Sequence, residues 1–510
     1  MPCCRSSCGT EHSSLVQVYL GSNLDRPSVI TTHMGLLQTY YTVGGFISAV
    51  LLVVVGIDQA YQRFSHKWTN EPPLLPYRIP IIGHALRFTA DCLGLFRAAH
   101  EYFPGSQAYS LFSFGKRVYV FTHYKDVSIV FRKSKALPFL PLIESLSGLA
   151  WDISPDGMRR LSEVDDTGDS IFRNAHVFYR DSLKVGPDLD VLTISFLHYL
   201  EKEFDQFEAQ KITDYVSLNK WSKTMLGTAS TSAMMGPALL RDNPDLLPSV
   251  WLVEQGFVLF VNRIPRIFAK KSYRARDHVL SAFTKYFSDE KNKEGSAPMM
   301  WEREAELRAK GISTKDIAAY SYAAYAVLLN NANPTACWLL RRIFSRTDLL
   351  PRLREEVAPA FASGNSITTL EQVQHLLTSC PLLRAFYDET LRLHSSSVSN
   401  RVVVEETTVG GYTLKVGHNV ICPSYVQHRL PEYFGNDTDK FEPERFIKPV
   451  LEKGTPADPK MVRAFGGGVS LCPGRFFASN EVLSYAASAL WRFDMTFKGE
   501  MVRIVPRKRE

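Results

Sequence analysis

The chain has 510 residues, of which 45% are hydrophobic and 22% are charged, and its formal net charge is +7. These charges are spread along the sequence without a block of five like charges, so we expect no nucleic-acid partner. The eight cysteines form no Cys-x-x-Cys pair, which argues against a disulfide framework and a zinc site. No linker or internal repeat divides the chain after residue 85, which favours one large domain.

A polar tail, residues 1–33, precedes an uncharged stretch of 24 residues, Met34–Ile57. About 20 apolar residues cross a hydrocarbon core as a helix, so residues 34–57 predict a transmembrane anchor. A cleaved signal peptide is the alternative, but its apolar core would lie nearer the N-terminus, behind a basic leader. Arg63, His66 and Lys67 follow the stretch, and the positive-inside tendency therefore places the rest of the chain in the cytosol.

Residues 58–84 are first basic and then rich in proline, with four prolines in the nine residues from Pro72 to Pro80. Proline at this density excludes a helix, so we expect a stiff extended hinge between the anchor and a single domain of residues 85–510.

The domain is expected to be mainly α with small β-sheets. Residues 108–122 predict two short strands around a turn, and most of residues 181–342 have helical periodicity. Strand signals return around residues 401–404, 412–414 and 420–423. Residues 254–271 place an apolar run beside basic residues, which is compatible with a loop in the membrane surface or with core packing.

One cysteine near the C-terminal end, Cys472, lies between Gly466-Gly467-Gly468 and Pro473-Gly474, before an apolar run with helical spacing. The glycines allow positive φ and close approach of the backbone to a flat group. Backbone amides and a helix N-terminus would stabilise a thiolate, and Pro473 suits the first helical position. The alternative is a glycine-rich turn with Cys472 as a small buried hydrophobe.

The pattern F-x-x-G-x-x-x-C-x-G, with Phe465, Gly468, Cys472 and Gly474 at its fixed positions, resembles the haem-thiolate loop of the cytochromes P450. The resemblance implies the cytochrome P450 fold and a haem b whose iron is bound by the Cys472 thiolate. Many members carry a basic residue two places before the cysteine, where this chain has Ser470.

Two further motifs agree with this resemblance. Glu389 and Arg392 have the i, i+3 spacing of one helix face, and Arg445 lies in a segment that resembles the family's P-x-R-F element. The resemblance implies that these three residues form a buried structural triad that holds the meander against the haem side.

The resemblance also indicates which residues bind the haem propionates. Arg401 is the first choice, and His428 and Arg475 are further candidates for the propionates or the proximal face. The family's W-x-x-x-R element is absent from its usual helix, and three residues are candidates to replace it: Arg173, His176 and Arg180.

The central helix departs from the family pattern. Most members have an acid followed by threonine that helps to deliver protons, whereas residues 328–338 contain no acid and have Pro334 near the expected threonine. Pro334 should kink the helix and free backbone groups. Asn331, three residues before the proline, resembles the pocket residue of bile-acid sterol hydroxylases and of prostacyclin synthase. We therefore expect Asn331 and Pro334 at the catalytic site.

The resemblance implies a monooxygenase of the endoplasmic reticulum membrane that inserts one oxygen atom from O2 into a large apolar substrate. A terpenoid, steroid or polyketide of specialised metabolism is expected. The chain has no G-x-G-x-x-G or Walker motif, so electrons should come from NADPH through NADPH–cytochrome P450 reductase. The alternatives are an isomerase of the same fold that needs no reductase, and a non-enzymatic haem carrier or sensor.

Overall fold

The structure is a computed structural model that describes residues 46, 48–50, 52–62, 69–451 and 454–507. Most of the expected anchor, residues 34–57, and the whole tail before it lie outside the described residues. Residues 46, 48–50 and 52–62 are helical. Among all the described residues, no helix is both long enough and apolar enough to cross a membrane. The chain divides into two compact units, Met1–Phe64 and Ser65–Glu510, and the second is the body described below.

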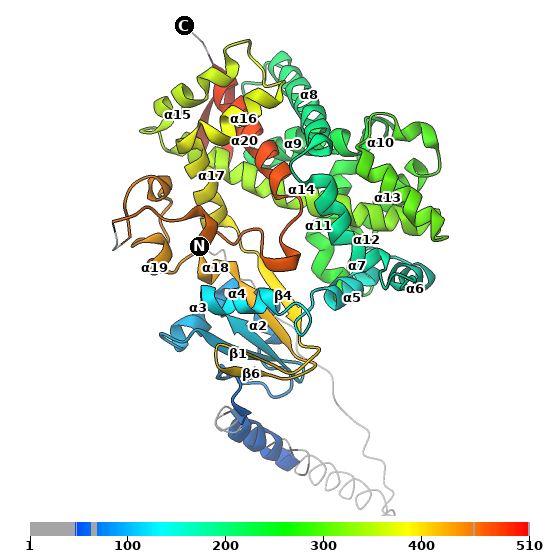
Figure 1. Ribbon diagram of the computed structural model, residues 1–510, viewed down its shortest axis with the longest axis vertical. Coiled ribbons are helices and arrows are strands. Elements are labelled where there is room, and N and C mark those ends of the chain that lie inside the picture. Colours follow the sequence, from blue (N-terminus) through cyan, green and yellow to red (C-terminus); the bar gives the residue numbers. More distant parts are fainter. Residues whose placement is uncertain (1–45, 47, 51, 63–68, 452–453, 508–510) are drawn as a thin grey trace, which may run out of the picture. The chain divides into compact units, whose positions relative to one another are not determined.

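The body is mainly helical with small sheets, as the sequence predicts (Figure 1). The helices in its first half are α2 (Ala85–Ala90), α3 (Cys92–Tyr102), α4 (Tyr124–Arg132), α5 (Leu140–Ala150), α6 (Pro155–Ser162), α7 (Ile171–Leu183), α8 (Pro187–Ala209), α9 (Leu218–Met235), α10 (Ala238–Asp242), α11 (Leu246–Val261), α12 (Lys270–Tyr286) and α13 (Pro298–Ala309). Those that follow are α14 (Thr314–Ser345), α15 (Leu350–Val357), α16 (Leu370–Thr378), α17 (Pro381–His394), α18 (Ser424–Gln427), α19 (Pro431–Phe434) and α20 (Arg475–Arg492).

The strands form three small sheets. Strands β1 (Ala108–Ser113), β2 (Lys116–Phe121), β7 (Asn419–Pro423) and β4 (Val398–Val402) form the largest, in that order. Within it, β2 and β7 are parallel and the other neighbours are antiparallel. The smaller sheets consist of β3 (Val216–Ser217), β9 (Met501–Pro506) and β8 (Phe493–Lys498), and of β5 (Thr407–Val409) with β6 (Tyr412–Leu414).

The largest sheet is covered on both faces. On β2, Tyr119 and Phe121 pack with α4, whereas Val118 and Val120 pack with α3. This alternation follows from the two-residue period of a strand. Because β4 continues from α17 and pairs with β7, the sheet brings Arg401 beside α4.

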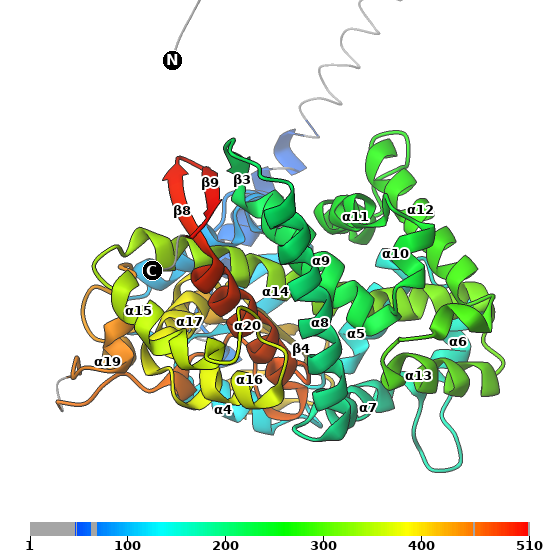
Figure 2. The same ribbon diagram turned by 90° about the horizontal axis from the view of Figure 1, so that it is seen from above.

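Helix α14 is the central element of the helical part. It begins at the N-cap Ser313, whose hydroxyl accepts a hydrogen bond from Asp316 N, and it packs against α9, α12, α17 and α20. Figure 2 shows α8, α9 and α20 running side by side next to α14. The helix continues through Pro334 without interruption, so the kink expected there does not break it. Thr335 Oγ1 still donates to Asn331 O at 3.1 Å.

The proline-rich segment is part of the body rather than a free spacer. Leu74 and Leu75 are buried. Leu75 N donates to Ser110 O of β1, and Ser110 N donates to Pro73 O. Glu71 is also buried: it accepts a 2.5 Å hydrogen bond from Tyr119 and lies 3.4 Å from Arg117. Proline excludes a helix here but leaves the carbonyls free, and these pair with the edge of the sheet.

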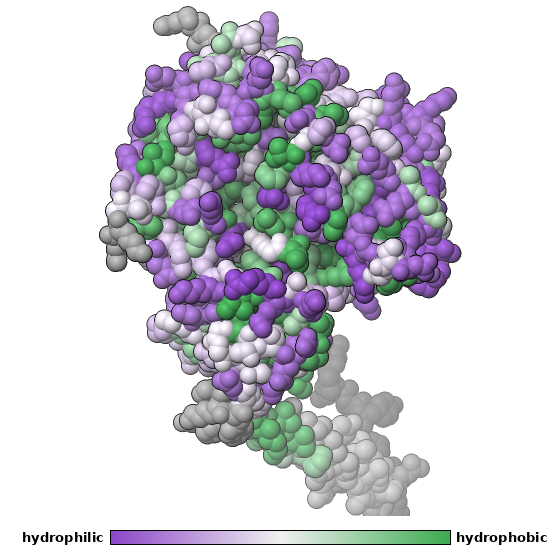
Figure 3. All heavy atoms as spheres, viewed as in Figure 1, coloured by the Kyte–Doolittle hydropathy of each residue, from purple (hydrophilic) through white to green (hydrophobic). Residues whose placement is uncertain are grey.

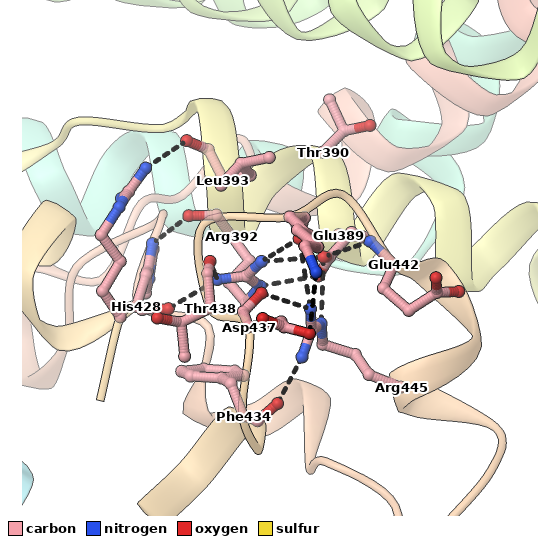
Figure 4. Close-up of polar contacts among 12 residues, drawn as sticks. Glu389, Thr390, Arg392, Leu393, His428, Phe434, Asp437, Thr438, Glu442 and Arg445 are labelled. Carbon is pink, nitrogen blue, oxygen red and sulfur yellow. Dashed lines mark hydrogen bonds and ion pairs between the residues drawn. The ribbon is translucent and has the colours of Figure 1, made fainter. Parts of the chain in front are cut away.

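A buried network of charges joins α17 to the irregular chain after α19 (Figure 4). Glu389 accepts from both Arg392 Nε at 2.6 Å and Arg445 Nε at 3.0 Å, and all three side chains are at most 2% exposed. Arg392 Nη1 also donates to the carbonyls of His428 and Thr438, at 2.8 and 2.7 Å. Two guanidiniums thus share one carboxylate, and backbone carbonyls take up their remaining hydrogens.

Replacing Glu389 with alanine should leave Arg392 and Arg445 buried without their carboxylate. A loss of this kind costs ~3–5 kcal/mol, a large part of the stability of a domain. We expect a protein that fails to incorporate its cofactor. Lys448→Ala, which breaks the partly exposed pair with Glu444, is the control and should behave as wild type. Thermal unfolding and cofactor content of both variants test this, and a fully loaded, stable Glu389→Ala protein would contradict it.

The burial of Glu71 sets where the body begins. A chain that starts at Thr69 keeps Glu71 and Asn70, whose carbonyl accepts from Thr413 N at 2.9 Å, whereas a chain that starts at Pro72 loses both. We expect the first chain to fold and bind its cofactor, and the second to be destabilised by ~3–5 kcal/mol because Arg117 then lacks this carboxylate. Equal melting temperatures of the two chains would refute this boundary.

Candidate functional site

The cysteine loop, residues 465–474, is closed by its own backbone before α20 begins. Cys472 N donates to Phe465 O at 3.0 Å, and Leu471 N donates to Gly468 O at 3.1 Å. Helix α20 starts at Arg475 with Gly474 as its N-cap. Pro473 therefore lies before the helix, and its expected place at the first helical position is wrong by two residues.

The glycines let the loop pack directly on its neighbours. A Cβ atom on Gly467 would lie 2.4 Å from the Phe131 ring, and one on Gly468 would lie 2.6 Å from Phe131 O. Gly468 also has a φ of +64°, which disfavours other residues. A Cβ on Gly474 would lie 3.0 Å from Leu328 Cδ2 of α14. The loop is thus held between α4 and α14, and larger residues at these positions would force it away.

The pKa of the Cys472 thiol is raised in this structure, because the burial of the group outweighs the other effects. The amides of Gly474 and Arg475 and the charge of Arg475 act in the opposite direction. The amides after Cys472 thus act on the thiolate in the direction that the sequence predicts, and burial is the larger effect. Arg475 itself donates to Cys472 O at 3.0 Å and covers the ring of Phe476.

Arg401 reaches the cysteine loop from β4. It is 3% exposed, and its Nη2 donates to the Ser470 hydroxyl while its Nη1 donates to Asn400 O at 2.6 Å. The guanidinium lies 5.4 and 5.5 Å from the ring centres of Phe131 and Phe139. No carboxylate of the described residues lies within ion-pair distance of it, and burial lowers its pKa. A buried cation of this kind calls for an anionic partner.

Helix α7 carries the three residues considered as replacements for the missing W-x-x-x-R element, and only one of the three contacts the cysteine loop. His176 Nε2 lies 2.9 Å from Leu471 O, so this nitrogen carries the hydrogen and donates it. Arg173 is exposed and donates to Gly168 O, and Arg180 is exposed and pairs with Asp181. Of these three residues, His176 is therefore the one placed to act at the site.

His428 is not available to a cofactor, contrary to the expectation from the sequence. It is fully buried, its Nδ1 donates to Arg392 O at 2.9 Å, and its Nε2 accepts from Arg463 N at 2.8 Å. Burial lowers its pKa to about 3. His428, drawn beside the triad in Figure 4, is thus a neutral link between the triad and the segment that leads into the cysteine loop.

One face of α14 is exposed although the helix is otherwise buried. Val327, Asn331, Pro334 and Trp338 lie on it at helical spacing, and Val327 is 56% exposed. Asn331 Nδ2 donates to Val327 O at 2.8 Å, which leaves its Oδ1 to accept a hydrogen bond. The neighbouring face carries Leu328, which touches Gly474 in the cysteine loop. The two expected catalytic residues therefore share a face of the helix that passes the loop.

Sequence reasoning missed several parts of this arrangement. The contact of Phe131 with the glycines and the bond between Arg401 and Ser470 join residues far apart in the chain, and no spacing indicates them. Asn333 is fully buried on α14, and neither amide atom has a partner among the described residues. Its sequence signal was only its membership of the asparagine-rich stretch.

The residues at this site fit a haem. A soft sulfur ligand, a buried arginine without a carboxylate and a glycine-rich loop that admits no side chain are what an iron porphyrin with acidic side groups requires. Cys472 would hold the metal, and Arg401 would neutralise a carboxylate.

Comparison with known proteins agrees with this chemistry. A family model described as Cytochrome P450 matches residues 258–508. Cytochrome P450 monooxygenase nodJ of Hypoxylon pulicicidum is 27% identical over 465 residues, 88% of each chain. Human 24-hydroxycholesterol 7-alpha-hydroxylase is 22% identical over 456 residues, 88% of this chain and 92% of its own. It agrees with the resemblance to sterol hydroxylases.

The fold is also that of a solved structure, the cyanobacterial CYP120A1 with retinoic acid bound. The TM-score is 0.66 at 19% identity, with 86% of this chain and 99% of the other covered. This likeness shows the fold. The family model and the relatives, together with the cysteine loop and the triad, show that the chain belongs to the cytochrome P450 family and is a haem-thiolate monooxygenase that receives electrons originating from NADPH.

Proposed function

We propose that Cys472 would bind the haem iron and that Arg401 would bind one of the haem carboxylates, while His176 holds the loop through Leu471 O. The observation that carries this assignment is the buried guanidinium of Arg401, which has no carboxylate partner in the described chain and touches the loop that presents the cysteine. Phe465, Gly468, Gly474 and Arg475 shape that loop rather than react.

The substrate we propose is a large apolar molecule, such as a terpenoid, steroid or polyketide of specialised metabolism. The exposed face of α14 supports this, since Val327, Pro334 and Trp338 offer apolar surface beside a single amide, Asn331. The relative named 24-hydroxycholesterol 7-alpha-hydroxylase takes a substrate of this kind by its name.

When bound, the haem supplies the activation of O2 and the insertion of one oxygen atom into the substrate. The chain itself must orient the substrate and supply protons. Residues 328–338 of α14 contain no acid and have Pro334 near the expected threonine, so protons have to arrive through water. Asn331 Oδ1 faces the exposed side of the helix and can accept a hydrogen bond from such a water or from the substrate.

We propose that the electrons reach the haem through NADPH–cytochrome P450 reductase, because the sequence has no nucleotide-binding motif of its own. The relatives named as monooxygenases favour this reaction over that of an isomerase of the same fold, which would need no electrons.

We also propose a single-pass anchor in the endoplasmic reticulum membrane with the body in the cytosol. The described part of the N-terminal unit supports this, since Phe46, Leu52, Val53 and Ile57 are exposed on a helix. Figure 3 shows hydrophobic surface on the described part of this segment. A second support lies in the body, where Ile267 and Phe268 are 67% and 77% exposed beside basic residues. Phe260 of the earlier apolar run is buried, whereas Val258 of the same run is 51% exposed.

Replacing Cys472 with alanine should abolish the carbon-monoxide difference band that reports a thiolate-bound ferrous haem. The sulfur ligand is lost, while the loop keeps its backbone hydrogen bonds. Cys422→Ala is a suitable control, because this buried cysteine lies on β7 and should leave the band unchanged. A normal thiolate band in the Cys472→Ala protein would refute the assignment of the ligand.

Oxygen insertion and isomerisation differ in their requirements. A monooxygenase should form product only with NADPH and the reductase, and its product should carry label from oxygen-18 gas. Asn331→Leu should slow product formation and increase the hydrogen peroxide released per NADPH, because it removes an acceptor for the water that carries protons. Lys315→Ala, in the exposed first turn of the same helix, is the control. Unlabelled product formed anaerobically without NADPH would instead establish an isomerase.

A further inference from the structure

The cysteine loop lacks the basic residue that many members of the family carry two places before the cysteine. That position is Ser470, which belongs to the short 3-10 turn Gly468–Ser470. The Ser470 hydroxyl is used twice, since it donates to Gly467 O at 3.2 Å and accepts from Arg401 Nη2. The guanidinium of Arg401, from strand β4, therefore lies beside the position at which other members carry their basic residue.

Space and charge explain why the two positions depend on one another. Arg401 is 3% exposed and is enclosed by the rings of Phe131 and Phe139, and Phe131 also packs against Gly467 and Gly468. A second guanidinium at residue 470 would have to share this enclosure with a like charge. A serine instead supplies an oxygen acceptor of small volume, which suits a cation that arrives from β4.

We propose that Ser470 is the positioning residue for Arg401, and that the two side chains together replace the loop's missing basic residue in binding a carboxylate of the cofactor. The proposal rests on the assignment of the haem site above. It predicts that the cation which neutralises the cofactor is fastened to the loop that carries Cys472, so that changes at residue 470 alter cofactor retention and reduction potential through Arg401.

The arrangement also has a second attachment, one residue nearer to the cysteine. His176 of α7 donates to Leu471 O, the carbonyl next to Ser470. The segment Ser470–Leu471 is thus held by two side chains from distant elements, immediately before the residue that binds the metal. This explains how a loop without its usual basic residue can keep its position.

The test uses the full-length protein with Ser470 changed to alanine, threonine or arginine, and with Ser479→Ala as a control. Ser479 Oγ donates to Arg475 O within α20 and does not touch Arg401. The readouts are the rate of haem transfer to apomyoglobin, the reduction potential and the carbon-monoxide band, none of which requires a substrate. Ser470→Ala should lose haem roughly tenfold faster than wild type, as expected for the loss of a hydrogen bond to a charged group. Ser470→Thr should retain haem.

The charge swap gives the sharper result. Ser470→Arg alone should lose haem at least as fast as Ser470→Ala, since it places two guanidiniums in one enclosure. Combining it with Arg401→Ser should restore retention in part, because one cation then serves the same carboxylate. A Ser470→Arg protein that retains haem like wild type, or an unchanged Ser470→Ala protein, would overturn the proposal. Loss of the thiolate band in wild type and Ser479→Ala would instead contradict the haem assignment itself.

Discussion

The buried carboxylate of Glu389 is the interaction on which the position of the cysteine loop depends. It neutralises one of two buried guanidiniums, and the second positive charge is spread over carbonyls of the irregular chain between α18 and the 3-10 turn Pro443–Phe446. These carbonyls have no helix or strand to bind them. The arginines therefore do for this segment what backbone ladders do elsewhere, and they hold it against α17.

The same network extends to the functional site. His428 connects the triad to the cysteine loop by two hydrogen bonds. Its Nδ1 donates to Arg392 O, and its Nε2 accepts from the backbone N–H of Arg463, two residues before Phe465. Because the imidazole is neutral and both nitrogens are bound, it acts as a fixed spacer. Removal of charge from the triad would therefore disturb the cysteine loop without touching it. This connection accounts for a structural triad being tied to the binding of a cofactor that it does not contact.

Buried arginines in this protein serve two purposes that their partners distinguish. Arg392 and Arg445 are satisfied by a carboxylate and by carbonyls, so they stabilise the fold. Arg401 has a hydroxyl, one carbonyl and two aromatic rings, but no described carboxylate, and so its charge is left for a ligand. Helix α14 contributes a second feature to the site, the exposed face that carries Asn331 and Pro334. It offers an amide oxygen and apolar surface where an acid and a hydroxyl are usual in the family.

Local chemistry was readable from the amino-acid sequence alone. The helical class of the body, the cysteine between glycines, the i, i+3 pair of Glu389 and Arg392, and the absence of an acid from residues 328–338 all depend on neighbouring residues or on motifs with fixed spacing. Tertiary structure alone decided which distant groups meet. Sheet pairing brings Arg401 to Ser470, helix packing brings His176 to Leu471, and burial makes His428 a neutral link and raises the pKa of Cys472. Burial and long-range contacts are properties of the folded chain, so the spacing of residues in the sequence does not predict them. The proline-rich segment shows the same division, because its prolines excluded a helix while only the free edge of β1 determined where it lies.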